Sequence, residues 1–327
     1  MEKARGLLAA GDRVAAAEAF RTCIDRCPDL IEAHIAYQDA LLGRPSGGSS
    51  SAVSPESIQS MRQLYDGLKD RPSSPEVPFL RARLQRLDRR EEPARLGLEE
   101  ALRRDPNFYL AYHELGQLWR GVDKLDRAAE SFAKALALRA DFAPARRQMA
   151  EVAAALGRGQ QAMDSYRLYL KDRPGDLDAK RALLSMLAYQ DSGSPDEAAK
   201  LADELLEVRP EDLTLLMDRA AVHWRQGEME KAVELYRRVV QRDPKRARAV
   251  LNYGNLMFTI GQRTPAGPER KYRLAKARSA FLYYRTLHSI DDAYDWFDLH
   301  LAVRVRLSRI EGELGKPGPA PVTWRDL

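Results

Sequence analysis

The stretch that decides the fold is YHELGQLWRGVDKLDRAAESF, residues 112–132. One face of a first predicted helix carries residues at positions i, i+3, i+4 and i+7: Tyr112, Leu115, Gly116 and Trp119. Ala128 and Phe132 lie one turn apart on a second predicted helix. A small residue on each helix lets the two backbones approach, and a large side chain fills the space beside it. The stretch therefore predicts a closely packed helical hairpin.

The same pattern recurs along the chain in steps of 34 residues, with one double step and one step that is two residues longer. Proline marks these steps at Pro72, Pro106, Pro174, Pro210 and Pro244. Alanine keeps the same phase at Ala94, Ala128, Ala162, Ala198 and Ala232. Glycine marks the predicted turns at Gly11, Gly157, Gly227 and Gly261. One such hairpin cannot bury its apolar face alone, so the hairpins are expected to stack into an all-α solenoid without strands.

This pattern resembles the tetratricopeptide repeat (TPR), W-x2-L-G-x2-Y…A-x3-F…P. Residues 112–140 match it as Tyr-x2-Leu-Gly-x2-Trp, then Ala-x3-Phe, with Ala140 in place of the proline. A second copy is Tyr253-Gly254-x2-Met257, followed by Gly261. The resemblance covers the chain from about residue 1 to about 290. It implies a right-handed α-solenoid of about eight helix-turn-helix units, and the abundance of Arg, Ala and Leu favours a bacterial source.

The units predict one solenoid over residues 1–315, closed by a capping helix at about 291–314. Insertions rich in Gly, Ser, Pro and charged residues interrupt it near 43–57 and 262–271, and both are expected to be flexible loops. Residues 316–327 are Pro-rich and are expected to form an extended tail.

Composition limits the classes of function. The chain has 327 residues and a net charge of +5, a mild excess that does not by itself indicate nucleic-acid binding. No apolar run of 18 residues occurs, so no membrane-spanning helix is expected. Charges throughout residues 1–20 do not fit a signal peptide, and a cytoplasmic location is expected. The alternative is a periplasmic or membrane-anchored protein whose leader precedes residue 1.

We found no catalytic, cofactor-binding or metal-binding motif in the sequence, and therefore expect a non-catalytic protein without a cofactor. Cys23 and Cys27, one turn apart, are interpreted as small packing residues. The densest polar cluster, residues 288–300, places Asp291, Asp295 and Asp298 on one helical face. These acids are interpreted as stabilising the start of a helix.

The resemblance implies a concave surface built from the first helix of each unit. Its expected partner-binding residues are Phe79, Arg83, Arg86, His113, Arg120, Arg147, Arg181, Tyr189, Trp224, Arg225, Arg248, Asn255 and Phe258. Arginine binds carboxylates through a planar fork, and aromatic side chains supply contact area. We therefore expect a protein partner with an acidic or extended segment. The alternative explanation is that a charge-rich chain places arginine on every surface.

The favoured function is a protein-interaction scaffold or adaptor. The alternative is a regulatory or accessory subunit of an enzyme or of an envelope assembly complex, and an RNA-binding repeat ranks third. An RNA-binding repeat would need a regular polar code. The fifth positions of successive first helices show no such code: Phe79, His113, Arg147, Arg181, Met217 and Leu251. Aromatic residues near the C-terminal end predict a second contact surface or an oligomer contact, unless they only fix the cap: Phe281, Tyr283, Tyr284, Tyr294, Trp296 and Phe297.

Overall fold

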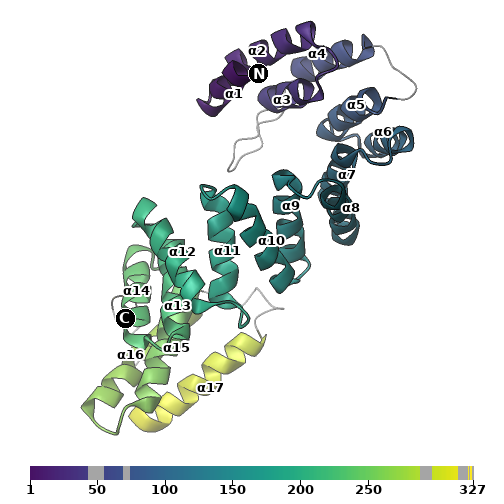
Figure 1. Ribbon diagram of the computed structural model, residues 1–327. Helices are drawn as coiled ribbons and strands as arrows, with labels where there is room; N and C mark the ends of the chain where they lie inside the picture. The colour runs from purple at the N-terminus through teal and green to yellow at the C-terminus, as the bar shows by residue number, and fades with distance from the viewer. Residues whose placement is uncertain (43–54, 69–73, 288–296, 316–322, 324, 326–327) are drawn as a thin grey trace. The chain divides into compact units, whose positions relative to one another are not determined.

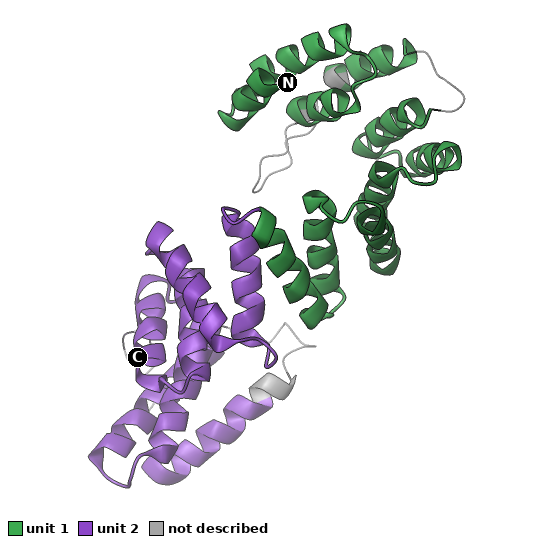
Figure 2. Ribbon diagram, in the orientation of Figure 1, with its two compact units in different colours: residues 1–172 green, residues 173–327 purple. Residues whose placement is uncertain are grey.

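The computed structural model describes residues 1–42, 55–68, 74–287 and 297–315, with residues 323 and 325. These residues form seventeen helices and no strand (Figure 1), which confirms the predicted all-α fold class. The chain divides into two compact units, residues 1–172 and 173–327 (Figure 2). Each unit is described separately below.

Unit 1 consists of five helical hairpins. Its helices are α1 (Glu2–Ala9), α2 (Arg13–Arg26), α3 (Ile31–Leu42), α4 (Pro55–Asp66), α5 (Glu76–Leu87), α6 (Glu91–Arg104), α7 (Tyr109–Gly121), α8 (Leu125–Leu138), α9 (Ala143–Ala155) and α10 (Gly159–Asp172). The first helices also contact one another in the order α3, α5, α7 and α9. They therefore form a continuous surface, which we call the first-helix face of unit 1.

Unit 2 consists of three hairpins and a final helix. Its helices are α11 (Leu177–Tyr189), α12 (Pro195–Val208), α13 (Leu213–Arg225), α14 (Met229–Arg242), α15 (Ala247–Arg263), α16 (Pro268–Leu287) and α17 (Phe297–Leu314). We call the surface of α11, α13 and α15 the first-helix face of unit 2. Helix α17 packs on α16 and buries Val303, Leu307 and Ile310.

Close approach of the two helices explains the pairing of small and large residues. A Cβ atom on Gly116 of α7 would lie 2.6 Å from the Phe132 ring on α8. In unit 2, a Cβ atom on Gly254 of α15 would lie 2.9 Å from the Phe281 ring on α16. Glycine leaves room for the aromatic ring at both positions, and the ring then fills the hairpin core.

The turn inside five of the hairpins contains a residue with positive φ. Gly11, Gly157 and Gly227 supply it, with φ between 71° and 85°. Arg89 and Asp123 occupy the same position of their repeats at φ 57°, where a side chain is less favourable. The prediction of a turn at Gly261 is wrong. Helix α15 continues to Arg263, so Gly261 is buried inside the helix, where the Leu274 side chain packs against it.

Two predicted insertions differ from the structure at their edges. Helix α4 begins at Pro55, so the insertion expected at 43–57 ends earlier, and its residues 43–54 lie outside the described residues. The insertion expected at 262–271 is shorter, since only residues 264–267 separate α15 from α16. Most of the tail expected at 316–327 lies outside the described residues. The described capping helix is Phe297–Leu314, and the start expected near 291 lies outside the described residues.

Two sets of predicted side chains occupy different environments. Cys23 is half-buried but Cys27 is exposed, so the packing role predicted for Cys27 is wrong. Among the C-terminal aromatics, Phe281 and Tyr284 are buried in the core of unit 2, and Tyr283 is half-buried against it. Those two buried rings are therefore not available for a contact surface. Tyr294, Trp296, Asp291 and Asp295 lie outside the described residues.

Candidate partner-binding surface

Charged side chains link successive first helices in unit 1. Arg83 on α5 is only 6% exposed. Its Nε donates to Glu114 Oε1 over 3.0 Å, and its Nη2 donates to Asp39 Oδ1 over 2.6 Å. Arg86, also on α5, donates from Nε to the second oxygen of Glu114 over 2.7 Å. The buried carboxylate on α7 therefore neutralises two arginines of the preceding first helix.

The electrostatics keep these groups ionised. Burial would raise the pKa of the Glu114 carboxyl, but Arg86 and Arg83 outweigh it and lower the pKa to about 2. Burial would lower the pKa of the Arg83 guanidinium, but Asp39 and Glu114 raise it. An arginine held by two carboxylates offers little charge to a partner.

The next pair of first helices repeats the arrangement. Arg120 on α7 pairs with Glu151 on α9 over 2.5 Å, and Arg147 pairs with the same carboxylate over 3.1 Å. Arg83 and Arg120 each meet a glutamate 31 residues further along the chain, which brings neighbouring first helices together. The four arginines expected to bind acidic groups in unit 1 are therefore paired with carboxylates within the unit: Arg83, Arg86, Arg120 and Arg147.

Three other predicted contact residues belong to the protein core. Phe79 is 1% exposed and packs edge-to-face on Phe108, with ring centroids 5.1 Å apart. Phe258 is buried in the core of unit 2. His113 is buried between the Phe132 and Phe142 rings, and this burial lowers its pKa to about 4, so it is neutral near pH 7. These three assignments are corrected, because a buried side chain cannot anchor a partner.

Two polar residues predicted in unit 2 hold the fold together. Arg225 at the end of α13 donates to the backbone carbonyl of Leu187 in α11 and to those of Asp191 and Gly193 in the insertion after that helix. Asn255 on α15 accepts a hydrogen bond from Arg306 of α17 over 2.7 Å. Their polar groups are therefore engaged within unit 2, and both assignments as partner-binding residues remain predictions.

The remaining predicted residues form an open cationic and aromatic surface on unit 2. Arg181 on α11 and Arg248 on α15 are exposed, and neither hydrogen-bonds or forms an ion pair with a described residue. The Arg248 guanidinium lies over the Tyr189 ring, 4.2 Å from its centroid. Trp224 is half-buried and packs against the core of unit 2. Arg181, Tyr189, Trp224 and Arg248 thus remain as candidate contact residues on the first-helix face of unit 2.

A buried carboxyl group lies beneath this surface. Asp218 on α13 is 3% exposed, and the Tyr189 hydroxyl donates a hydrogen bond to it. Its Oδ2 atom has no hydrogen-bond partner among the described residues. Burial raises the pKa of Asp218 to about 6, although Tyr189 and Arg248 act in the opposite direction. The Asp218 carboxyl is therefore about half protonated near pH 6.

The described residues contain no group of three or more His, Cys, Asp or Glu that could hold a metal ion. In the same part of the chain, no helix has both the length and the apolar character to cross a membrane.

The ion-pair partners of the unit 1 arginines could have been found from the sequence. The signal was a glutamate 31 residues after an arginine of the preceding first helix.

Known proteins resemble parts of the chain. The family model described as tetratricopeptide repeat matches residues 185–254. DnaJ homolog subfamily C member 3 from Homo sapiens is 28% identical over 142 residues, 39% of this chain and 28% of that protein. Protein O-mannosyl-transferase TMTC1 from Homo sapiens is 25% identical over 183 residues, 55% of this chain and 19% of that protein. The chain thus spans less than a third of the length of these two curated relatives.

Solved structures share the fold. The crystal structure of YrrB, a TPR protein with an unusual peptide-binding site, matches with a TM-score of 0.53 and 18% identity, over 59% of this chain and 97% of YrrB. The APC/C hetero-tetramer Cut9–Hcn1 matches with a TM-score of 0.51 and 10% identity, over 93% of this chain and 55% of the matched chain. The family match within unit 2, the in-phase repeats and this shared fold show that the chain contains tetratricopeptide repeats.

Proposed function

We propose that the protein is a non-catalytic scaffold that holds an acidic, extended segment of a partner protein on the first-helix face of unit 2. The repeat architecture is that of a protein-interaction scaffold. The observation that carries the location is the difference between the two first-helix faces. The arginines of unit 1 are paired with Glu114 and Glu151, whereas Arg181 and Arg248 in unit 2 have no carboxylate partner among the described residues.

The side chains around these arginines suit a peptide segment. A guanidinium group binds a carboxylate through two parallel hydrogen bonds. The Tyr189 ring packs against the Arg248 guanidinium, which restricts its position, and it adds aromatic contact area. Trp224 on the middle helix of the same face is the best placed apolar anchor. A regulatory subunit of an enzyme, the alternative function, would use the same surface for its catalytic partner.

Affinity capture from the source organism, followed by mass spectrometry, identifies the partner. The test variant is Arg181→Glu with Arg248→Glu. The matched control is Arg26→Glu with Arg90→Glu, an equal change of charge at exposed residues of unit 1 outside its first helices. We expect the test variant to lose the partner and the control to retain it. Equal capture by both variants would rule out the first-helix face of unit 2 as the binding surface.

A further inference from the structure

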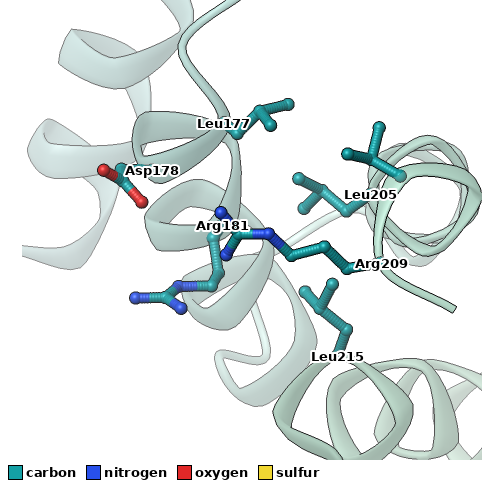
Figure 3. Close-up of a pocket in the computed structure, with 7 residues that line it drawn as sticks. Leu177, Asp178, Arg181, Leu205, Arg209 and Leu215 are labelled. Carbon is teal, nitrogen blue, oxygen red and sulfur yellow. The ribbon is translucent and has the colours of Figure 1, made fainter. Parts of the chain in front are cut away.

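A shallow pocket lies between α11, α12 and α13 in unit 2 (Figure 3). Its apolar part consists of Leu177, Leu205, Val208 and Leu215. Leu205 and Leu215 are buried, whereas Val208 at the end of α12 is 58% exposed. The pocket therefore combines an apolar floor with an exposed apolar edge, and an occupant would lie across this floor rather than enter an enclosed cavity.

Three charged side chains surround this floor: Asp178, Arg181 and Arg209. Figure 3 shows the Arg209 side chain extending from the end of α12 toward α11, the helix that carries Arg181. Neither guanidinium group hydrogen-bonds or forms an ion pair with a described residue. The rim thus carries two guanidinium groups and one carboxylate, an excess of one positive charge.

Two nearby carboxylates of α12 pair with other cations. Glu204 pairs with Lys180 over 2.6 Å. Asp203 pairs with Arg219 over 2.9 Å. Neither of these two acids is therefore a counter-ion of the rim arginines.

An arginine at the end of a second helix could simply interact with the helix dipole. The other repeats argue against this as the whole explanation. Arg139, at the equivalent end of α8, donates to Asp141 and to the Tyr109 hydroxyl. Asp243 occupies the equivalent end of α14. The fold therefore does not require an unpaired arginine at this position.

We propose that the pocket binds a partner segment in which a leucine-sized side chain stands next to one or two carboxylates. The apolar side chain covers the floor at Leu205 and Leu215 together with Val208. The neighbouring carboxylates accept hydrogen bonds from Arg181 and Arg209. This assignment rests on the proposed function and makes it more specific, since it defines which acidic segment the scaffold selects.

Three blocked peptides test the pocket directly: Ser-Glu-Leu-Asp-Ser, its diamide form Ser-Gln-Leu-Asn-Ser, and Ser-Glu-Ser-Asp-Ser. Binding is followed by NMR on the full chain with labelled leucine and valine methyl groups, at about 1 mM peptide, where weak binding is visible. We expect the methyl signals of Leu177, Leu205, Val208 and Leu215 to shift with the first peptide only. Shifts with all three peptides, or with none, would overturn the proposal.

Arg209→Glu should weaken binding of the first peptide roughly five- to tenfold, since it replaces an attraction by a repulsion at a partly exposed site. Arg173→Glu is the matched control, because Arg173 precedes Pro174 as Arg209 precedes Pro210 and lies outside the pocket. Equal weakening by both variants would overturn the assignment. So would shifts of the same methyl signals on concentrating the protein without peptide, because the occupant would then be a second copy.

The captured partner separates this inference from the proposed function. If Arg181→Glu with Arg248→Glu abolishes capture while Arg209→Glu and Val208→Ser leave it unchanged, the pocket assignment fails and the scaffold function stands. If Arg209→Glu and Val208→Ser also reduce capture, the assignment is supported. If the first peptide binds in the pocket but none of these variants alters capture, the pocket is a real site and the proposed binding surface for the partner fails.

Discussion

Gly116 and Gly121 lie on the same helix, α7, but have opposite surroundings. A methyl group on Gly116 would contact the buried Phe132 ring, whereas a methyl group on Gly121 would meet no atom within 4 Å. We expect Gly116→Ala to destabilise the protein by about 1–3 kcal/mol through overpacking. Gly121→Ala should stabilise it by roughly 0.5 kcal/mol, because alanine restricts the unfolded chain. Urea unfolding followed by circular dichroism measures both, and effects of the same sign would contradict this account of the hairpin.

Asp218 makes a second prediction at the scale of one residue. Its pKa is raised from 3.8 to about 6 in the folded protein, so the folded state holds this proton more tightly than the unfolded state. The stability that the group contributes is complete below about pH 4 and is lost as the pH rises through about 6.

Asp218→Asn keeps an oxygen that can accept from the Tyr189 hydroxyl but cannot ionise. Relative to the wild type, the variant should therefore gain stability between pH 4 and pH 7, by up to about 3 kcal/mol. Unfolding curves at several pH values give the difference between the two proteins. Groups common to both, such as His113, cancel in this difference. A difference that does not change with pH would show that Asp218 is ionised normally.

At the scale of elements, adjacent first helices of unit 1 are joined by one buried and one half-exposed carboxylate. The side chain of Glu114 is 4% exposed and that of Glu151 is 30% exposed, and each pairs with two arginines. Glu114→Gln leaves buried arginine charge without its partner, which should cost about 3–5 kcal/mol. Glu151→Gln should cost less than about 1 kcal/mol, because water screens its arginines. Thermal unfolding of both variants distinguishes them, and equal losses would mean that burial does not set the strength of these pairs.

The helices could be predicted well from the sequence, because each hairpin has nearly the same length and its packing residues recur at a fixed spacing. A hairpin of fixed length repeats its small and large residues, and Ala128 beside Phe132 is enough to set the register. The turn predicted at Gly261 was wrong because α15 is longer than the other first helices. Gly261 therefore lies inside the helix, where it packs against Leu274.

The candidate surface was harder to predict, because the position of a residue within its repeat does not determine which residues of the neighbouring repeat it contacts. Arg147 and Arg181 hold the same position in their repeats. Arg147 pairs with Glu151, whereas Arg181 has no such partner among the described residues. The hydrogen bonds of Arg225 were also not predicted. The end of α11 and the insertion after it place three backbone carbonyls beside its guanidinium. Pairing depends on the neighbouring repeat, which a position count does not include.

At the scale of the whole molecule, the net charge of +5 says little about where a partner is attracted. Much of the arginine charge on the first-helix face of unit 1 is cancelled at short range by Glu114 and Glu151. Attraction of an acidic segment should therefore depend on the open arginines of unit 2. At ordinary ionic strength, solution ions screen this attraction beyond about 8–10 Å. The open arginines should therefore act on a partner during its final approach, and added salt should weaken their effect.

Binding kinetics of the captured partner at several salt concentrations test this division of roles. Arg181→Glu with Arg248→Glu should slow association and flatten its dependence on salt, because charges on an interface rim mainly govern encounter. Trp224→Ala should leave association nearly unchanged and speed dissociation, by an amount worth about 2 kcal/mol if the ring is an anchor. Circular dichroism must first show that Trp224→Ala keeps its helices, since the ring also packs against the core of unit 2. If the double variant associates at the wild-type rate at low salt, long-range attraction does not come from Arg181 and Arg248, and the partner binds elsewhere.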